Sequence, residues 1–132
     1  MGYKNKMLKR QRRKARRLGQ RGERTAAVLL REMGWEILDR NYGTKHGEID
    51  IVARSGDVVV FVEVKTRRKA LRARPGEAVG HQKRENLTRA ARQFLREIGF
   101  PDVRYRFDIV ELLMNGIWLR DMAHYPNAFR EK

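Results

Sequence analysis

The 132-residue sequence contains no cysteine, which excludes a disulfide framework and a zinc site built on thiolates. It has no apolar run near the roughly 18 residues that a membrane-spanning helix needs. No apolar signal segment follows its basic first residues. We therefore expect a soluble, cytoplasmic protein. The length suits a single domain with one hydrophobic core.

Acidic residues are absent from the first 21 positions, which carry ten lysines and arginines. The remaining chain holds 21 basic and 16 acidic residues, a net charge of +5 out of the total of +15. Because like charges oppose a helix there, we expect residues 1–18 to be a disordered basic arm, followed by one domain at 19–132. Such an arm suits a polyanion, since released counterions drive binding. A merely solvated tail is the alternative, and the arm lacks the apolar face that membrane binding needs.

The hydrophobic pattern predicts an α/β fold with a mixed sheet, in the order helix, three strands, helix, two strands. The predicted elements are a helix at 23–33, strands at 35–42, 48–53 and 58–65, a helix at 77–99, and strands at 103–110 and from 117. Gly34 is a typical end for the first helix. The strand at 103–110 alternates apolar and polar residues, which predicts that only one of its faces is buried. His124, near the end of the chain, is expected to pack or to form hydrogen bonds.

The strands at 48–53 and 58–65 have acids among their apolar residues, namely Asp50 and Glu63. A buried carboxylate costs several kcal/mol unless it is paired, protonated or bound to a metal. If the loop at 54–57 has an even number of residues, Asp50 faces Phe61 and lies diagonal to Glu63 on the same face of the hairpin. Lys65 shares that face, because it follows Glu63 by two residues.

A divalent cation would resolve the repulsion between two such carboxylates. Mg²⁺ or Mn²⁺ takes hard oxygen ligands and keeps several waters, one of which can become a nucleophile. The carbonyl group of Val64 could supply a further ligand, and Lys65 would hold the attacking water or stabilise charge on a phosphate. Acids, metal and lysine in a basic protein suit phosphodiester hydrolysis. The alternative is that Glu63 and Lys65 are ordinary polar residues facing solvent.

The arrangement of Asp50 followed by Glu63-Val64-Lys65 resembles the D…(D/E)-x-K core of restriction-endonuclease-like nucleases. Further runs between residues 19 and 129 resemble the YraN-like, UPF0102-type family of small predicted endonucleases: GERTAAVLL, WEILDRNY, GEIDIVA, VVVFVEVKTR, GEAVGHQKRENLTRAARQFL and HYPNAF. That family is similar in fold to archaeal Holliday-junction resolvases. The resemblance implies a restriction-endonuclease-like mixed sheet of about five strands flanked by helices.

The resemblance also implies roles for single residues. Glu23, Asp50 and Glu63 match metal-binding acids, and Lys65 matches the catalytic lysine. Without the resemblance, Glu23 is interpreted as an acid in the first turn of the predicted helix at 23–33, where its charge complements the helix dipole. Glu48 belongs to the same GEID run and, by strand parity, lies on the face of Asp50 as an outer ligand or salt-bridge partner.

Gln82 and Lys83 open the second helix, where related nucleases place a polar helper, although a solvated surface pair is the favoured interpretation. Two sets of basic residues would contact nucleic-acid backbone: Arg67, Arg68, Lys69, Arg72 and Arg74 after the motif, and Arg12, Arg13, Lys14, Arg16 and Arg17 in the arm. Such contacts position a strand without reading its sequence.

The leading hypothesis is a magnesium-dependent endonuclease that hydrolyses DNA phosphodiester bonds, with branched and damaged DNA among its candidate substrates. The main alternative is a non-catalytic nucleic-acid-binding module that keeps the nuclease scaffold. A third is an adaptor that docks onto a larger assembly. Resolvase-like relatives pair as dimers, so a homodimer is one expected arrangement.

Overall fold

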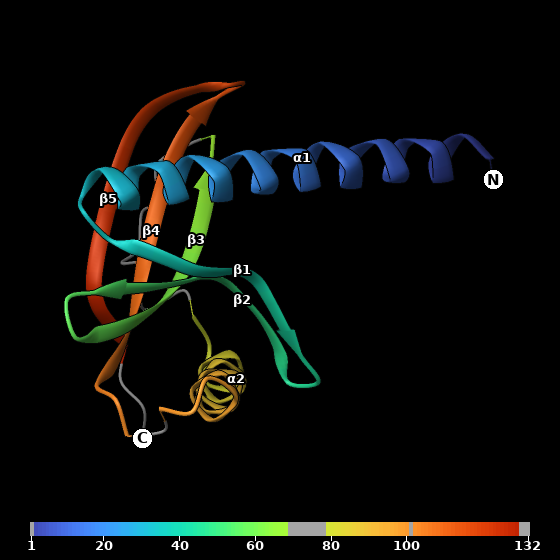
Figure 1. Ribbon diagram of the computed structural model, residues 1–132. Helices are drawn as coiled ribbons and strands as arrows, with labels where there is room; N and C mark the ends of the chain where they lie inside the picture. Colours follow the sequence, from blue (N-terminus) through green and yellow to red (C-terminus); the bar gives the residue numbers. More distant parts are fainter. Residues whose placement is uncertain (1, 69–78, 101, 130–132) are drawn as a thin grey trace.

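The computed structural model describes residues 2–68, 79–100 and 102–129, and side chains from residue 6 onward in those ranges. It confirms the α/β class and the expected order of two helices and five strands (Figure 1). The elements are α1 (Gly2–Glu32), β1 (Glu36–Thr44), β2 (Gly47–Ser55), β3 (Val58–Arg67), α2 (His81–Glu97), β4 (Tyr105–Asn115) and β5 (Trp118–Phe129). The expected start of the second helix, at residue 77, lies outside the described residues.

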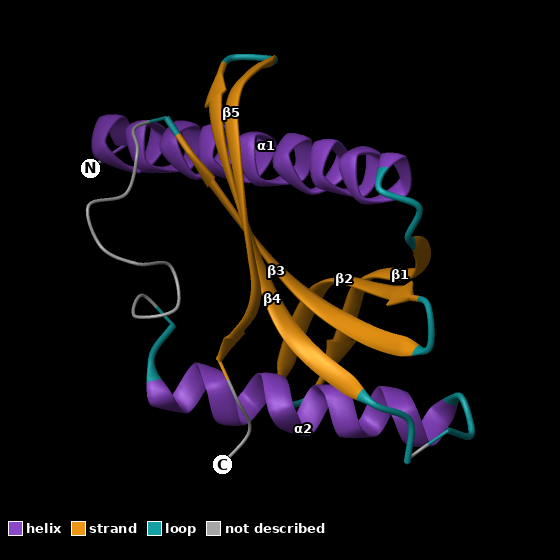
Figure 2. Ribbon diagram, turned by 90° about the vertical axis from the view of Figure 1, so that its left-hand side faces the viewer, coloured by secondary structure: helices purple, strands orange, loops and turns teal. Residues whose placement is uncertain are grey.

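The five strands form one mixed sheet in the sequential order β1-β2-β3-β4-β5. Neighbouring strands are antiparallel except β3 and β4, which run parallel. Parallel neighbours need a long crossover connection, and α2 lies in that connection. The two helices cover opposite faces of the sheet, as Figure 2 shows.

Apolar side chains fill both faces, which explains why β3 reads as an almost continuous apolar run. On the α2 side the buried cluster includes Phe61, Phe94 and Phe107. On the α1 side it includes Leu30 and Val62. The acids of the hairpin therefore lie within a sheet that is covered on both sides.

Helix α1 begins at Gly2, about 20 residues before the expected start near residue 23. The charge repulsion that argued for a disordered arm is outweighed, because α1 has a packed nucleus around Ala26 and Leu30. Lys, Arg, Gln and Ala are good helix formers that can extend such a nucleus. At the other end the helix stops as predicted: Gly34 has φ of 89°, and the amide of Trp35 donates to the carbonyl of Leu30 at 3.0 Å. Within the described residues, neither helix combines the length and apolarity required to cross a membrane.

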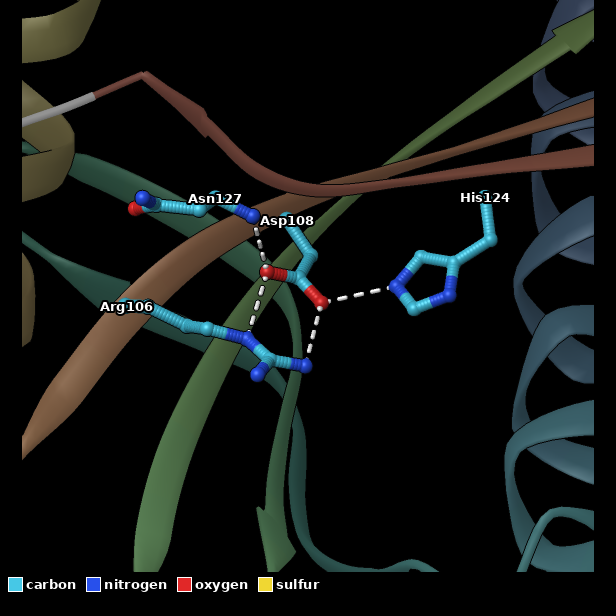
Figure 3. A network of polar contacts seen from close by, with 4 residues as sticks. All are labelled: Arg106, Asp108, His124 and Asn127. Atoms are coloured by element: carbon cyan, nitrogen blue, oxygen red, sulfur yellow. Dashed lines mark hydrogen bonds and ion pairs between the residues drawn. The ribbon is translucent and has the colours of Figure 1, made fainter.

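Strand β4 is buried on both faces, so the expected one-sided burial was wrong. Asp108 is fully buried on the face opposite Phe107, where its carboxylate has several partners. Arg106 donates to it at 3.0 and 3.2 Å, the backbone N–H of Asn127 donates at 2.8 Å, and Nε2 of His124 lies 2.7 Å away (Figure 3). These contacts compensate the buried charge and hold β5 against β4. They also give His124 the hydrogen-bonding role expected from the sequence.

Helix α1 lies close to β3 at Gly22. A Cβ atom at this position would overlap the side chain of Thr66, so only glycine allows this backbone approach. Gly19, in the preceding turn of the same helix, has no such neighbour within 4 Å.

We predict opposite effects of alanine at these two glycines. Gly22→Ala should lower the free energy of unfolding by about 1–2 kcal/mol, because overpacking forces the helix away from β3. Gly19→Ala should raise it by about 0.5–1 kcal/mol through helix propensity alone. Urea denaturation of both variants measures the difference, and a Gly22→Ala protein as stable as Gly19→Ala would contradict the close approach.

Candidate metal centre

The hairpin of β2 and β3 has a two-residue turn, Gly56 and Asp57, between Ser55 and Val58. The even turn keeps the expected parity, but the register differs from the expected one. Val52, not Asp50, stands opposite Phe61, because the strands extend closer to the turn than the sequence indicated. The paired positions end at Ile51 and Val62. Continuing this register brings Asp50 directly beside Glu63 rather than diagonal to it.

Asp50 lies where the ladder between β2 and β3 ends. Its Oδ2 accepts a hydrogen bond of 2.8 Å from the backbone amide of Val64. A side-chain oxygen from β2 therefore satisfies a backbone donor of β3 that lies beyond the last paired residues. This contact fixes the Asp50 carboxylate against the strand that carries Glu63.

Glu63 is only 7% exposed and has two lysine partners. Nζ of Lys83 lies 2.5 Å from its Oε1, and Nζ of Lys65 lies 3.4 Å from the same atom. Lys83 on α2 is thus the nearer cation: its side chain is exposed, as the sequence favoured, and its Nζ also contacts Glu63. Gln82 does lie exposed, and its amide donates to Asn86 on its own helix at 3.1 Å.

Two further carboxylates converge on Asp50. These are Glu23 on α1 and Glu48 on β2. One carboxylate oxygen from each of the three acids lies within 4.8 Å of the other two. Asn41 on β1 joins these two acids: in the amide orientation that satisfies both, its nitrogen donates to Glu23 at 2.7 Å and to Glu48 at 2.9 Å. The structure therefore brings together Glu23, Glu48, Asp50 and Asn41, with Glu63 beyond Asp50.

Sequence reasoning missed two polar residues near the site. Asn41 has φ of 54°, a left-handed conformation that asparagine tolerates well, but no spacing ties it to the acids. Glu111 on β4 is 8% exposed and pairs with Lys65 in the parallel register. Glu111 follows the buried Ile109 by two residues and therefore lies on the same face of the strand. Extending the predicted strand beyond residue 110 would have identified it.

Burial and mutual repulsion raise the pKa values of the clustered acids. The pKa of Asp50 rises to about 8, first through burial and then through the charge of Glu63, against the opposing hydrogen bond from Val64. Burial also raises the pKa of Glu23, with Glu48 adding to the effect. Asp50 therefore keeps its proton at pH values where an isolated carboxyl group would be ionised.

The two lysines respond to their surroundings in opposite directions. Burial lowers the pKa of Lys65, although the charge of Glu63 opposes this. Burial also lowers the pKa of Lys83. The hydrogen bond to Glu63 and the negative charge of Glu63 outweigh this effect, so the pKa of Lys83 is raised. Lys83 is therefore the firmly charged partner of Glu63, and Lys65 gives up its proton more readily.

The basic residues predicted to contact nucleic acid lie outside this cluster. Arg67 and Arg68 stand at the end of β3, and the arm residues lie exposed along α1. Lys69, Arg72 and Arg74 lie outside the described residues.

The protein is thus an α/β protein with a cluster of carboxylates and two lysines at one end of the β2–β3 ladder. Sequence comparison identifies its family. The profile of the uncharacterised protein family UPF0102 matches residues 22–112, which include the clustered acids and the two lysines that contact Glu63. The chain is 46% identical over 100 residues to a UPF0102 protein of Caldicellulosiruptor saccharolyticus, covering 76% of this chain and 85% of the relative. It is 44% identical over 112 residues to one of Syntrophotalea carbinolica, covering 85% and 90%. This chain belongs to the UPF0102 family.

We predict that the metal-free protein loses stability between pH 5 and pH 8. The folded state keeps a proton on Asp50 up to a pKa of about 8, whereas the unfolded chain releases it near the ordinary value of 3.8. The folded state binds more protons in this window, so its stability falls as the pH rises. One proton contributes at most about 1.4 kcal/mol per pH unit.

Urea denaturation in the presence of a chelator, at several pH values, measures this slope. Asp50→Asn should flatten it, because asparagine has no proton to lose. Asp57→Asn is the matched control: this carboxylate is 83% exposed in the hairpin turn, and its removal should leave the slope intact. An unchanged slope in Asp50→Asn would show that Asp50 does not hold the proton.

Proposed function

We propose that this UPF0102 protein is a divalent-metal-dependent endonuclease that hydrolyses phosphodiester bonds in DNA. The observation that supports this most directly is the meeting of Asp50 and Glu63 at the end of the β2–β3 ladder, with Lys65 beside Glu63. These residues are the ones that match the D…(D/E)-x-K pattern of restriction-endonuclease-like nucleases. The geometry is consistent with that pattern, since two acids from adjacent strands and a lysine share one site.

The donor set fits Mg²⁺ or Mn²⁺. Glu23, Asp50, Glu63 and the carbonyl group of Val64 would hold the ion, and all of them offer hard oxygen atoms. The raised pKa of Asp50 supports this fit. Burial and the charge of Glu63 destabilise the ionised carboxylate, and a bound cation would stabilise it. When bound, the ion polarises a phosphate oxygen and makes a coordinated water more acidic.

The protein's own groups supply positioning and charge. Lys65 would donate a hydrogen bond to the attacking water or to the phosphate, where negative charge increases during hydrolysis. Asn41 would orient Glu23 and Glu48, since its amide contacts both. Arg67 and Arg68, together with the predicted contacts Lys69, Arg72 and Arg74, would place the DNA backbone next to these groups.

A non-catalytic nucleic-acid-binding module is the second candidate function. One observation favours it: Lys83 pairs with Glu63, its Nζ lying 2.5 Å from Oε1 of the carboxylate. In such a protein the lysines would permanently take the place of the cation, and the basic residues would bind nucleic acid without cleavage. Metal binding separates the two functions.

For the endonuclease we expect calorimetry to detect binding of Mg²⁺ or Mn²⁺ and gel assays to detect cleavage of branched, single-stranded or duplex DNA. Asp50→Asn and Glu63→Gln should abolish both, because each removes a ligand charge. Lys65→Gln should lower the cleavage rate by about 10²–10⁴-fold and leave metal binding nearly unchanged.

Asp121→Asn is the matched control for these substitutions, since Asp121 is exposed on β5, where its carboxylate accepts a hydrogen bond from the amide of Met122 at 2.8 Å. It should bind metal and cleave like the unaltered protein. Nucleic-acid binding without any metal binding would support the second candidate. Cleavage that survives in both Asp50→Asn and Glu63→Gln would refute the site.

A further inference from the structure

A cleft of about 440 Å³ lies where α1, the end of β3 and the β4–β5 hairpin meet. Five of the residues that line it are basic: Lys14, Arg17, Arg21, Arg68 and Arg120. They come from elements and connections that are far apart in the sequence. No acidic residue is among the described residues that line this basic cleft.

The cations of the basic cleft lack the compensation found elsewhere. Arg54, Arg104 and Arg106 each pair with a carboxylate within 3.2 Å. In the part of the chain that the structure describes, no ion pair joins any of the five cleft residues to an acid. Like charges gathered without acids repel one another, and a bound anion relieves that repulsion.

Part of the cleft wall is apolar. Leu18 and Met114 line it beside the basic side chains, and Met114 is only 2% exposed. A low-dielectric wall strengthens the attraction between a cation and an anion relative to open water. The cleft therefore combines surplus positive charge with a surface that excludes some solvent.

The basic cleft lies next to the candidate metal centre across one helix–strand contact. Gly22 packs against Thr66, and on a helix the neighbours Arg21 and Glu23 are rotated about 100° to either side of it. On β3, Lys65 precedes Thr66, and Arg68 follows two residues after it. Three residues of strand span roughly 10 Å, so a strand of a few nucleotides can reach both places.

We infer that the basic cleft seats backbone phosphates of the nucleic-acid strand that the metal centre would act on. The inference rests on the proposed function and adds Arg21 and Arg120, which the sequence did not single out. The recognised chemistry is the phosphodiester backbone, because arginine forks match phosphate oxygens and the cleft offers no described acid. DNA and RNA share that chemistry, so the experiment includes both.

The basic cleft continues along α1 as a stripe on one face of the helix. Lys14 and Arg17 belong to both the cleft and the stripe, whose residues are Lys6, Lys9, Arg10, Arg13, Lys14 and Arg17. Spacings of three and four residues keep these side chains on one face. From Lys6 to Arg21 the helix rises roughly 22 Å, and Figure 1 shows the N-terminal part of α1 extending beyond the sheet. A nucleic-acid strand bound in the cleft can therefore continue along the basic face of α1.

The test replaces Arg21 and Arg120 together by glutamine and measures binding to fluorescein-labelled single-stranded DNA, duplex DNA and RNA of the same sequence. The measurements are made with a chelator present at several salt concentrations. We expect affinity to fall at least about tenfold. The slope of log affinity against log salt should become shallower by about 0.7–0.9 for each phosphate that the variant no longer neutralises.

The matched control is the double substitution Arg54→Gln with Arg104→Gln. It also removes two positive charges, but these arginines are exposed and are paired with Glu36 and Asp57. Its affinity should stay within about threefold of the unaltered protein, with an unchanged salt slope. Equal reductions in the two double variants would overturn the cleft, because the effect would then be one of net charge. A larger reduction for RNA than for DNA would support the cleft and assign it to RNA.

The absence of natural cysteine allows a second, positional measurement. Asn115→Cys places a thiol at an exposed residue of the cleft, and Asp57→Cys places one at the other end of β3. Bound nucleic acid should slow maleimide labelling at position 115 and leave position 57 unaffected. Equal protection at the two positions, or none at 115, would overturn the proposal.

These measurements separate the cleft from the endonuclease. Binding and protection at position 115 are measured in chelator, so they report on the cleft and require no metal. If the unaltered protein binds through the cleft and never cleaves, the cleft stands and the endonuclease fails. If it cleaves, and the Arg21 and Arg120 variant binds and cleaves equally well, the cleft fails and the endonuclease stands.

Discussion

The hydrogen bond from the Val64 amide to the Asp50 carboxylate connects the fold to the site. It lies where the β2–β3 ladder ends, so a side chain completes the pairing of a backbone donor. An apolar residue at position 50 would leave that amide unpaired at a cost of about 1–3 kcal/mol. The acid is thus part of the sheet's hydrogen bonding, which explains its place in an apolar strand. The same contact holds the Asp50 carboxylate beside Glu63, and the rest of the cluster forms around it.

The cluster is stable because its negative charges are offset in three different ways. Asp50 keeps a proton, since burial raises its pKa to about 8. Glu63 is paired with Lys83 and Lys65, and Glu23 shares the Asn41 amide with Glu48. A bound cation would displace the proton and weaken the lysine contacts. In the proposed endonuclease, a divalent ion would take over part of this compensation, because its charge is higher than that of a proton or a lysine.

Much of this arrangement could be predicted from the sequence, because strand parity and apolar periodicity are local properties. They predicted the order of elements and the common face of Asp50 and Glu63. The register was wrong because it depends on where the turn begins, and Gly56-Asp57 alone makes the turn. Spacing could not predict the contacts of Asn41 and Lys83 with the acids, because β1 and α2 reach the acids only through tertiary packing. Only the family resemblance marked Lys83 as a candidate helper. Asp108 was assigned to an exposed face because its partners, Arg106, His124 and Asn127, come together only when β5 pairs with β4.

The continuous helix α1 changes the meaning of the basic N-terminal segment. A disordered arm would lose conformational entropy on binding a polyanion, whereas side chains on a formed helix already have a fixed direction. The helix is anchored to β3 at Gly22, one residue from Glu23. The orientation of its basic face is therefore set by the same contact that places an acid in the cluster. A shift of α1 along β3 would move the cationic stripe and Glu23 together, so the charge pattern of the surface and the geometry of the acids are mechanically linked.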